Sequence, residues 1–382
     1  MNKNFDIALV GGGLQNALIA LAVVRHQPEA RVVLFERGQR LGGNHLWCFH
    51  DGDLSSGMEQ LVRPMVRRRF EHYDVHFPKL SRRLDQTYSA VSSEDLAAQL
   101  EPLFDVAHRT LHLGCEVTQV GESSVTLSDG SRIEADLVVD ARGPQHLESV
   151  RASGYQKFVG LELQLDRDAD VDAPILMDAR VPQIDGFRFM YVLPFEPRRI
   201  LIEDTCFSDS RQLDVDQVRN EVLRYAVCRG LSPKAIIREE QGVLPLPLRT
   251  GAPQPSVRPL LAGYQGGWFH PTTGYSFPVA ARLAEHVATR PAARILDDAF
   301  RALVRDQGRQ LRFSCFLNRL LFRGFRPEDR WGVLQRFYGL NPETIRRFYA
   351  HRTTAIDRTR ILCGRPPRGM SVSSVITGGP PQ

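Results

Sequence analysis

Residues 10–20 read VGGGLQNALIA, and this stretch decides the fold. The apolar residues 5–10 before it predict a buried strand, residues 14–27 predict a helix, and RVVLFER (31–37) predicts a second buried strand. In such a βαβ unit the glycines turn the chain tightly, and the free N–H groups at the helix N-terminus face a pyrophosphate. The expected phosphate-binding residues are Gly11, Gly13, Leu14, Gln15 and Asn16.

The glycine turn departs from the usual pattern at one position. Asn16 stands where a third glycine normally allows close helix–strand packing. We expect the larger residue to move the helix slightly without removing the phosphate site. Glu36 lies 23 residues after Gly13, where an acid accepts from ribose hydroxyls. The pattern therefore predicts dinucleotide binding; the alternative is a glycine turn required only for backbone geometry.

The composition is that of a soluble globular protein. The chain has 382 residues, 24% of them charged, and its apolar runs fall short of the roughly 18–20 residues of a spanning helix. The apolar N-terminal segment is interrupted by glycines and lacks a basic leader, so we expect no signal peptide. Six scattered cysteines without a CxxC motif predict a reduced, cytoplasmic protein and no metal site.

The charge is distributed unevenly. From Arg301 to the end there are 16 arginines, no lysine and five acids, a net charge of +11, whereas residues 1–300 sum to −6. Residues 311–340 interleave Phe, Leu and Trp with Arg. This composition favours the surface of an anionic membrane, and the alternative is a core helix with a charged outer face. Without a recognisable nucleic-acid module, we expect no nucleic-acid partner.

Further elements follow from the pattern. Residues 92–104 predict a serine-capped helix, residues 115–143 predict three strands with a turn at Asp129–Gly130, and GFRFMYVLPF (186–195) with RRILIEDTCF (198–207) predicts a hairpin. The remainder of 151–250 shows short strand signals broken by proline, and the chain from Asp297 is mostly helical. The expected division is a dinucleotide-binding domain over 1–60, 90–150 and 255–300, a substrate domain over 61–89 and 151–254, a helical region over 301–367, and a flexible tail over 368–382.

Four longer motifs are more specific than the fold. GGNHLWCFH (42–50), RILIEDTCF (199–207), FHPTTGYSFP (269–278) and QRFYGL (335–340) closely resemble the lycopene β-cyclases of carotenoid-making bacteria. The layout is similar to the two-domain flavoproteins of the hydroxylase type. The resemblance implies an α/β protein with a Rossmann-like FAD-binding domain, a β-sheet substrate domain and a helical C-terminal region.

The resemblance also implies an unusual activity for a dinucleotide-binding protein. Each acyclic ψ-end of lycopene closes to a β-ring without a change of formula, giving β-carotene via γ-carotene. This isomerase requires reduced FAD, with NAD(P)H as the expected reductant, and acts on lycopene and other ψ-ended carotenoids. The expected location is the cytoplasm, at the inner face of the membrane. Alternatives on the same fold are a flavin monooxygenase, a polyene reductase and a non-catalytic lipid-escort protein.

The resemblance places the acidic motif of the family on Glu203 and Asp204. Adjacent strand residues point to opposite faces, so we expect one of the two carboxyls to face the substrate. Glu203 is the first candidate for the proton donor, because apolar surroundings keep a carboxyl protonated. The reduced flavin is the other candidate, as acid or as cation stabiliser. Without the resemblance, both acids would be read as a solvated strand end, or as partners of Arg198 and Arg199.

The remaining site residues follow from the other motifs. Gly43, Gly143 and Gly274 are expected to approach the cofactor, although Gly263-Tyr264 stands where relatives of this fold have Gly-Asp. The expected substrate-lining residues are Trp47, Trp268, Phe269, His270 and Tyr275. The alternative for the aromatic residues is core packing, and for His270 it is a structural role rather than that of a base.

Overall fold

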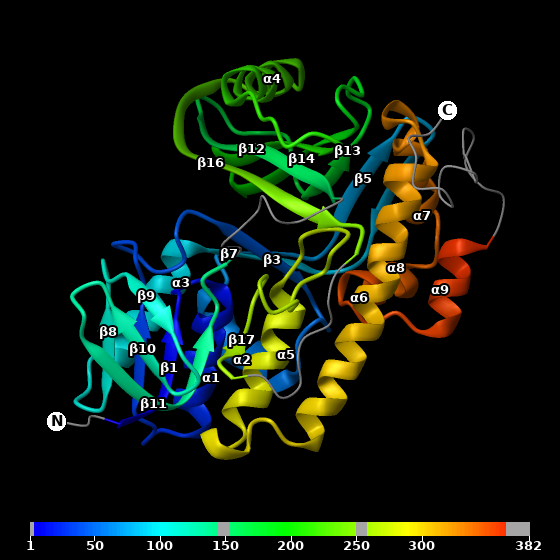
Figure 1. Cartoon of the computed structure of the whole chain (residues 1–382). Coiled ribbons are helices and arrows are strands. Elements are labelled where there is room, and N and C mark those ends of the chain that lie inside the picture. Colours follow the sequence, from blue (N-terminus) through cyan, green and yellow to red (C-terminus); the bar gives the residue numbers. More distant parts are fainter. Residues whose placement is uncertain (1–3, 144–152, 250–257, 364–382) are drawn as a thin grey trace.

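The computed structural model describes residues 4–143, 153–249 and 258–363. They form a first large sheet that begins at the N-terminal strand, a second large sheet and a helical C-terminal part (Figure 1). This arrangement confirms the predicted α/β fold class. The predicted tail over 368–382 lies outside the described residues, as do parts of the other predicted domains at 144–152, 250–257 and 364–367.

The first sheet has the strand order β8-β2-β1-β11-β10-β9, and β17 pairs with β11. Its central strands are parallel, so the carboxyl ends of β1, β2 and β11 lie at one edge, where the glycine turn begins. The predicted strand–helix–strand unit is confirmed. The strands are β1 Asn4–Val10, β2 Val32–Phe35, β8 Arg109–His112, β9 Val117–Val120, β10 Ser124–Leu127, β11 Arg132–Asp140 and β17 Leu260–Leu261.

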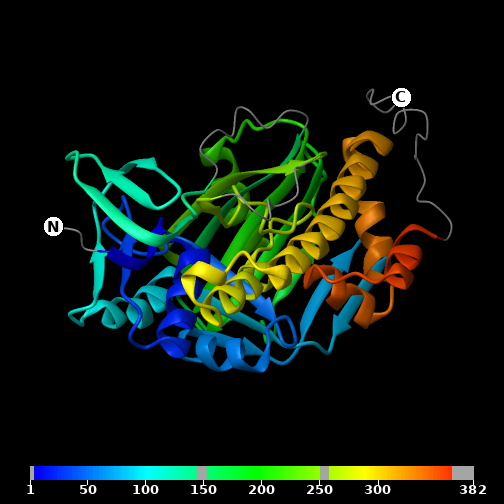
Figure 2. The same cartoon turned by 60° about the horizontal axis from the view of Figure 1, so that its bottom comes forward.

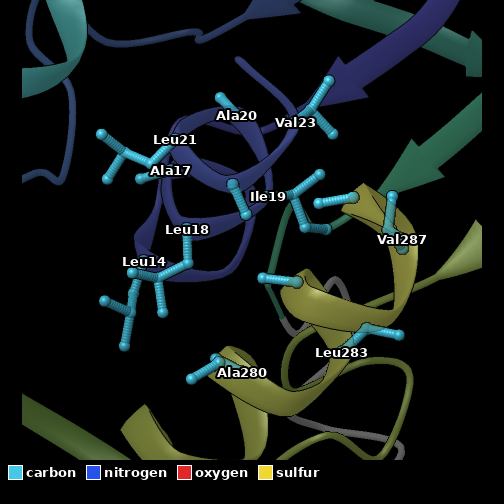
Figure 3. Close-up of a cluster of buried hydrophobic side chains, with 14 of the residues drawn as sticks. Leu14, Ala17, Leu18, Ile19, Ala20, Leu21, Val23, Ala280, Leu283 and Val287 are labelled. Atoms are coloured by element: carbon cyan, nitrogen blue, oxygen red, sulfur yellow. The ribbon is translucent and has the colours of Figure 1, made fainter. Parts of the chain in front are cut away.

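Two apolar helices pack together beneath this sheet. Helix α1 (Leu14–His26) is buried along its first ten residues, and it lies against α5 (Phe277–Ala288). Figure 3 shows the two helices side by side, with Leu14, Leu18 and Ile19 of α1 and Leu283 and Val287 of α5 in one buried apolar cluster. Burial on nearly every side explains why the sequence of α1 is almost continuously apolar.

Helix α3 (Ser93–Leu100) starts at the predicted serine. The Ser92 hydroxyl accepts the Asp95 N–H, and the Asp95 carboxylate accepts the Ser92 N–H in return, which is a capping box. The α-helix ends earlier than predicted because Pro102 follows, and Glu101–Phe104 form a 3₁₀ turn. Other 3₁₀ turns cover Arg63–Met65, Ala292–Arg294 and Pro327–Asp329.

The second sheet has the order β16-β12-β15-β14-β13-β5-β6. Helix α4 (Val215–Cys228) covers one face of it, and the predicted hairpin is confirmed as β14 and β15. The short strand signals on either side prove to be parts of two long strands, β12 and β16. The strands are β5 Tyr73–Phe77, β6 Leu80–Leu84, β12 Ser153–Leu165, β13 Ile175–Asp178, β14 Phe187–Glu196, β15 Arg199–Ser208 and β16 Pro233–Pro247.

A small sheet of β3 (Leu46–His50), β7 (Tyr88–Ser92) and β4 (Arg68–Phe70) lies between the two large sheets, near α2 (Ser56–Val62). The C-terminal helices stand beside the second sheet (Figure 2). They are α6 Asp298–Gly324, α7 Trp331–Tyr338, α8 Pro342–Tyr349 and α9 Ala355–Leu362. Among the described residues, no helix combines the length and the apolar character that a membrane crossing requires.

Candidate functional site

The glycine turn between β1 and α1 is shaped to receive an anion. Gly11 has a φ of +96°, and a Cβ there would lie 2.9 Å from the Ala141 carbonyl oxygen, so only glycine fits. Gly13 is the N-cap of α1, no side chain caps that helix, and a Cβ on Gly13 would meet nothing within 4 Å. The helix N-terminus therefore faces open space with its first N–H groups free, as a bound pyrophosphate requires.

Asn16 takes the place of the third glycine by capping the end of β1. Its amide donates hydrogen bonds to the carbonyl oxygens of Val10 (3.0 Å) and Gly11 (2.9 Å), and the side chain is fully buried. The amide of Gln15 donates to the Ala280 carbonyl oxygen (3.0 Å) and so joins α1 to α5. Leu14 is buried in the shared core of these helices. Gln15 and Asn16 each keep a buried amide oxygen without a partner in the described structure.

Glu36 lies where the acid of a ribose site is expected. Its two carboxylate oxygens accept the N–H groups of Gly12 and Gly38, both at 2.7 Å. A hollow beside it is lined by Gly11, Arg37, Arg142 and residues 115–117, which lead into β9. Gly143 follows with a φ of +81°, and a Cβ there would meet nothing within 4 Å. The glycine turn, the open helix end and this acid fit the adenosine and diphosphate of a dinucleotide.

The loop before α5 brings the first sheet up against the second. Gly274 has a φ of +67°, and a Cβ there would lie 3.1 Å from Leu244 of β16 and 3.3 Å from the side-chain oxygen of Gln156 of β12. That Gln156 oxygen is buried and has no partner among the described residues. Tyr264, which stands where relatives have an acid, donates to the Pro245 carbonyl oxygen and stacks on Phe269 at 4.0 Å between ring centroids.

Trp268 and His270 are buried, and both form hydrogen bonds to backbone carbonyl oxygens. The Trp268 indole is buried, donates to the Leu261 carbonyl oxygen (3.2 Å) and packs against Phe300. His270 is hydrogen-bonded to the Phe348 carbonyl oxygen (3.0 Å), and burial lowers the pKa of this imidazole to about 3. These contacts correspond to the packing and structural interpretations of both residues.

Tyr275 and Trp47 lie between the first and second sheets. The Tyr275 hydroxyl donates to the buried Asp53 carboxylate (2.7 Å), and its ring lies near His50 of β3. Trp47, also on β3, is half-buried beside the positive-φ glycines at 42 and 43, with its ring 3.2 Å from the position of a Cβ on Gly42. Both aromatic residues therefore border the region where the first sheet with its helices and the second sheet meet.

Glu203 lies on the face of β15 that is turned toward β3 and β7. Its neighbour across the ladder is Tyr191 of β14, whose hydroxyl contacts Cys48 (3.3 Å) and the Tyr88 hydroxyl (3.0 Å). The Thr205 hydroxyl donates to one Glu203 carboxyl oxygen. Burial, and secondly the nearby Glu240 carboxylate, raises the pKa of Glu203 to about 8. This carboxyl is therefore protonated near neutral pH and able to donate.

Asp204 points to the other face of β15, toward α4. Its carboxylate makes a two-point ion pair with the buried Arg188 guanidinium, at 2.9 Å and 2.6 Å, and Glu221 of α4 lies 3.1 Å from the same guanidinium. The two neighbouring acids therefore have opposite environments, as strand alternation predicts. The alternative pairing with Arg198 and Arg199 is wrong, because these side chains bind Asp168 and Glu162.

Sequence reasoning missed one acid on the same face. Glu240 of β16 is 7% exposed, pairs with Arg238 and lies near Glu203 across the sheet. Glu240 lies in the stretch REEQGV (238–243), which can be read as an alternating strand. The sequence does not reveal, however, that this strand pairs with β12. An apolar cavity of about 120 Å³ lies farther along, lined mainly by α6 to α9 and by Thr272 and Thr273 of the Gly274 loop.

In fold, the chain is similar to FAD-dependent monooxygenases. Solved structures of similar fold include a geranylgeranyl bacteriochlorophyll reductase-like protein from Thermoplasma acidophilum (TM-score 0.63, 12% identity, 99% of this chain and 96% of that chain). Another is a probable FAD-dependent monooxygenase from Pseudomonas aeruginosa (TM-score 0.58, 15% identity, 84% of this chain and 96% of that chain). At these identities the likeness concerns the fold alone.

The family follows from closer relatives. The model of the lycopene cyclase protein family matches residues 6–375. The chain is 38% identical to a lycopene beta-cyclase of Pantoea ananas (96% of each chain covered) and 40% identical to one of Pseudescherichia vulneris (95% of this chain and 94% of the relative). The chain belongs to the lycopene cyclase family, which confirms the resemblance seen in its motifs.

Proposed function

We propose that this protein is a lycopene β-cyclase that closes the ψ-ends of lycopene and other ψ-ended carotenoids to β-rings by protonation, without net redox change. The observation that carries the proposal is Glu203, a carboxyl that forms no ion pair with any described residue, in the acidic motif of a chain from this family. Such a reaction is an isomerisation, because the atoms of the linear end and of the ring are the same.

The chemistry requires an acid that is protonated and a surface that tolerates a carbocation. Glu203 supplies the proton because burial disfavours its charged form. Tyr191 and Tyr88 lie beside it with their hydroxyls bonded to each other, and Trp47 borders the same region. Aromatic faces attract a cation while offering it no ready nucleophile. Asp204 stays in its ion pair with Arg188 and positions the strand from the opposite face.

The residues of the glycine turn fit FAD. Gly11, Gly13 and the first turn of α1 (Leu14, Gln15, Asn16) would hold its diphosphate, Glu36 its ribose, and Gly43, Gly143 and Gly274 would allow its close approach. When bound in reduced form, with NAD(P)H as the proposed reductant, it supplies negative charge that stabilises a nearby cation. Around that site, Phe269 and Tyr275 are the proposed substrate-facing aromatic residues of the loop, while Trp268 and His270 hold the loop from within.

We further propose that the helical end contacts the inner membrane surface, where a carotenoid dissolves. On α6, Arg309 and Arg312 are exposed. Burial lowers the pKa of the half-buried Arg358 of α9, and the nearby charges of Arg309 and Arg312 lower it further. Ile356, 64% exposed, belongs to the same helix as Arg358. An apolar side chain beside clustered guanidinium groups suits an anionic lipid interface.

The test is anaerobic incubation of the purified protein with lycopene in liposomes and chemically reduced FAD, in H₂O and in D₂O. A blue-shifted product of unchanged mass in H₂O, with one deuterium per ring in D₂O, is the expected result. A gain of two hydrogens or one oxygen in H₂O would replace the proposal with a polyene reductase or a monooxygenase. Unchanged lycopene that stays bound would identify a lipid-escort protein instead.

A further inference from the structure

A row of side chains crosses the second sheet at the level of Glu203. The ladders pair Glu203 with Gly160 of β12 on one side and with Tyr191 of β14 on the other, and Gly160 pairs in turn with Glu240 of β16. Glycine leaves the space between the two acids empty of side chain. A Cβ on Gly160 would lie 3.3 Å from Cγ of Glu240 and 3.4 Å from Oε2 of Glu203. The two glutamates therefore meet above a glycine.

The two carboxyls have different partners. Glu240 accepts a hydrogen bond of 2.6 Å from Arg238 Nη1, an ion pair with both side chains largely buried. Arg238 is itself fixed through Nε to Glu162 (3.1 Å) and through Nη1 to Asn44 (3.1 Å). Among the described residues, the Thr205 hydroxyl is the one side chain that hydrogen-bonds Glu203. The geometry thus favours the charged form of Glu240 and the neutral form of Glu203.

Closing a ψ-end to a β-ring requires a base as well as an acid. The proton adds to C2 of the terminal double bond, the resulting cation at C1 is attacked by the C5=C6 bond, and the cation that forms at C5 must lose the proton on C6. We propose that Glu240 is a second catalytic residue, whose carboxylate removes the C6 proton after Glu203 has protonated C2. The inference rests on the proposed function and assigns a residue that the family motif does not contain.

The step balances without a further reactant. The O–H bond of Glu203 breaks as C2–H forms, the C1–C6 bond forms, and C6–H breaks as an O–H bond forms on Glu240. The site is then reset when this proton passes from Glu240 to Glu203. The two side chains lie next to each other above Gly160. Both ends of one substrate can therefore be closed in succession by the same pair.

The negative charge on Glu240 also contributes to the raised pKa of Glu203. A negative Glu240 raises the pKa of Glu203, so Glu240→Gln lowers that pKa and moves the alkaline limb of the activity profile to lower pH. Burial raises the pKa of Glu240 above its ordinary value, and the Arg238 guanidinium offsets only part of that rise. The other charged or titratable groups around the pair are Glu162 of β12, Cys48 of β3, Tyr88 of β7, Tyr191 of β14, His45 in the loop before β3, and Asp204 from the far face of β15.

The position of the ring double bond is the decisive measurement. A C5 cation that no longer meets a base at C6 loses a proton from C4 or from the C5 methyl group instead, which gives ring isomers of the same mass. For Glu240→Gln we expect a kcat at least about 100-fold lower, a product that contains these isomers, and the pH shift above. Glu240→Asp keeps the charge opposite Arg238, so it preserves the fold if the glutamine variant does not, and it should give a smaller loss with the same isomers.

Glu239→Gln is the matched control, because Glu239 is the adjacent residue and its carboxylate binds Arg219 of α4 on the opposite side. It should match the wild-type protein in rate and product. Wild-type rates and β-rings alone from both Glu240 variants would overturn the inference, as would an equal loss in Glu239→Gln. Failure of the wild-type protein to cyclise lycopene would instead refute the proposed function, so the two failures are distinguishable.

Discussion

Glu203 and Asp204 are adjacent in sequence, yet their removal should have opposite consequences. Arg188 is only 4% exposed, and two carboxylates, those of Asp204 and Glu221, neutralise its guanidinium. Asp204→Asn removes one of these two negative charges. Breaking a buried ion pair costs about 3–5 kcal/mol. Because Glu221 remains 3.1 Å from the same guanidinium, we expect the low end, about 3 kcal/mol. Glu203→Gln breaks no ion pair, so at pH 5, where the Glu203 carboxyl is neutral in the fold, its free energy of unfolding should stay close to that of the wild-type protein.

The activities should follow the reverse order. Glu203→Gln removes the proton donor, and the loss of a general acid lowers the rate by about 100-fold to 10,000-fold. Because the side chain at position 204 faces α4, the folded fraction of Asp204→Asn should retain the wild-type kcat. The assay pairs urea unfolding, followed by tryptophan fluorescence, with cyclisation under reduced FAD. With a slope near 3 kcal/mol per molar urea, the Asp204→Asn midpoint should fall by about 1 M. An active Glu203→Gln, or an inactive Asp204→Asn of wild-type stability, would refute the assignment of the two faces.

Three further predictions follow from the same geometry. Gly160→Ala places a methyl group 3.3–3.4 Å from both glutamates and should lower kcat by separating them, with an unchanged melting temperature; wild-type kcat would contradict it. The pKa of Glu203 is raised to about 8 in the fold, so its stabilising contribution is complete below about 4.5 and is lost as the pH rises through 8; urea midpoints should therefore fall more between pH 5 and 9 in the wild-type protein than in Glu203→Gln. Changing Arg309, Arg312 and Arg358 together to Glu should weaken binding to anionic vesicles at least about 100-fold, at about 1 kcal/mol per lost cation, and equal sedimentation with vesicles would argue against the proposed membrane contact.

The sequence predicts the local parts of this fold well. The strand, glycine turn and helix around residue 13 rest on contacts between near neighbours, and the serine cap at Ser92 lies within three residues of its partner. The hairpin of β14 and β15 is likewise local. Each of these elements is specified by period, turn chemistry or capping, which are all properties of a short window.

Long-range pairing is what the sequence does not reveal. Strands β12 and β16 pair over most of their length although about 70 residues separate them, and their proline and glycine residues hide their length. Proline at positions 245 and 247 weakens the strand signal, which is consistent with β16 being an edge strand of the sheet. Because the partner of β16 is unknown from the sequence, the neighbour of Glu203 across Gly160 is unknown as well.

The departure at residue 16 shows how a pattern can be broken without loss of its purpose. A third glycine would let α1 pack close to β1, whereas the buried Asn16 amide bonds the carbonyl oxygens of Val10 and Gly11 and so joins the helix to the strand end. The phosphate-facing side of the turn depends on other residues: Gly11 for its backbone angle and Gly13 for the open space before the helix. One position therefore serves packing while its neighbours leave room for the proposed ligand.

The same separation of tasks governs the proposed acid site. Strand alternation assigns Glu203 to the inner face and Asp204 to the ion pair under α4, so stability and the proposed chemistry depend on adjacent residues on opposite sides of one strand. Across the sheet, Arg238 and Glu162 fix the Glu240 carboxylate from one side, and Gly160 leaves room for it to reach Glu203. A larger residue at 160 would separate two acids whose opposite protonation states depend on their proximity. The glycine is therefore as necessary to the proposed proton transfer as the glutamates themselves.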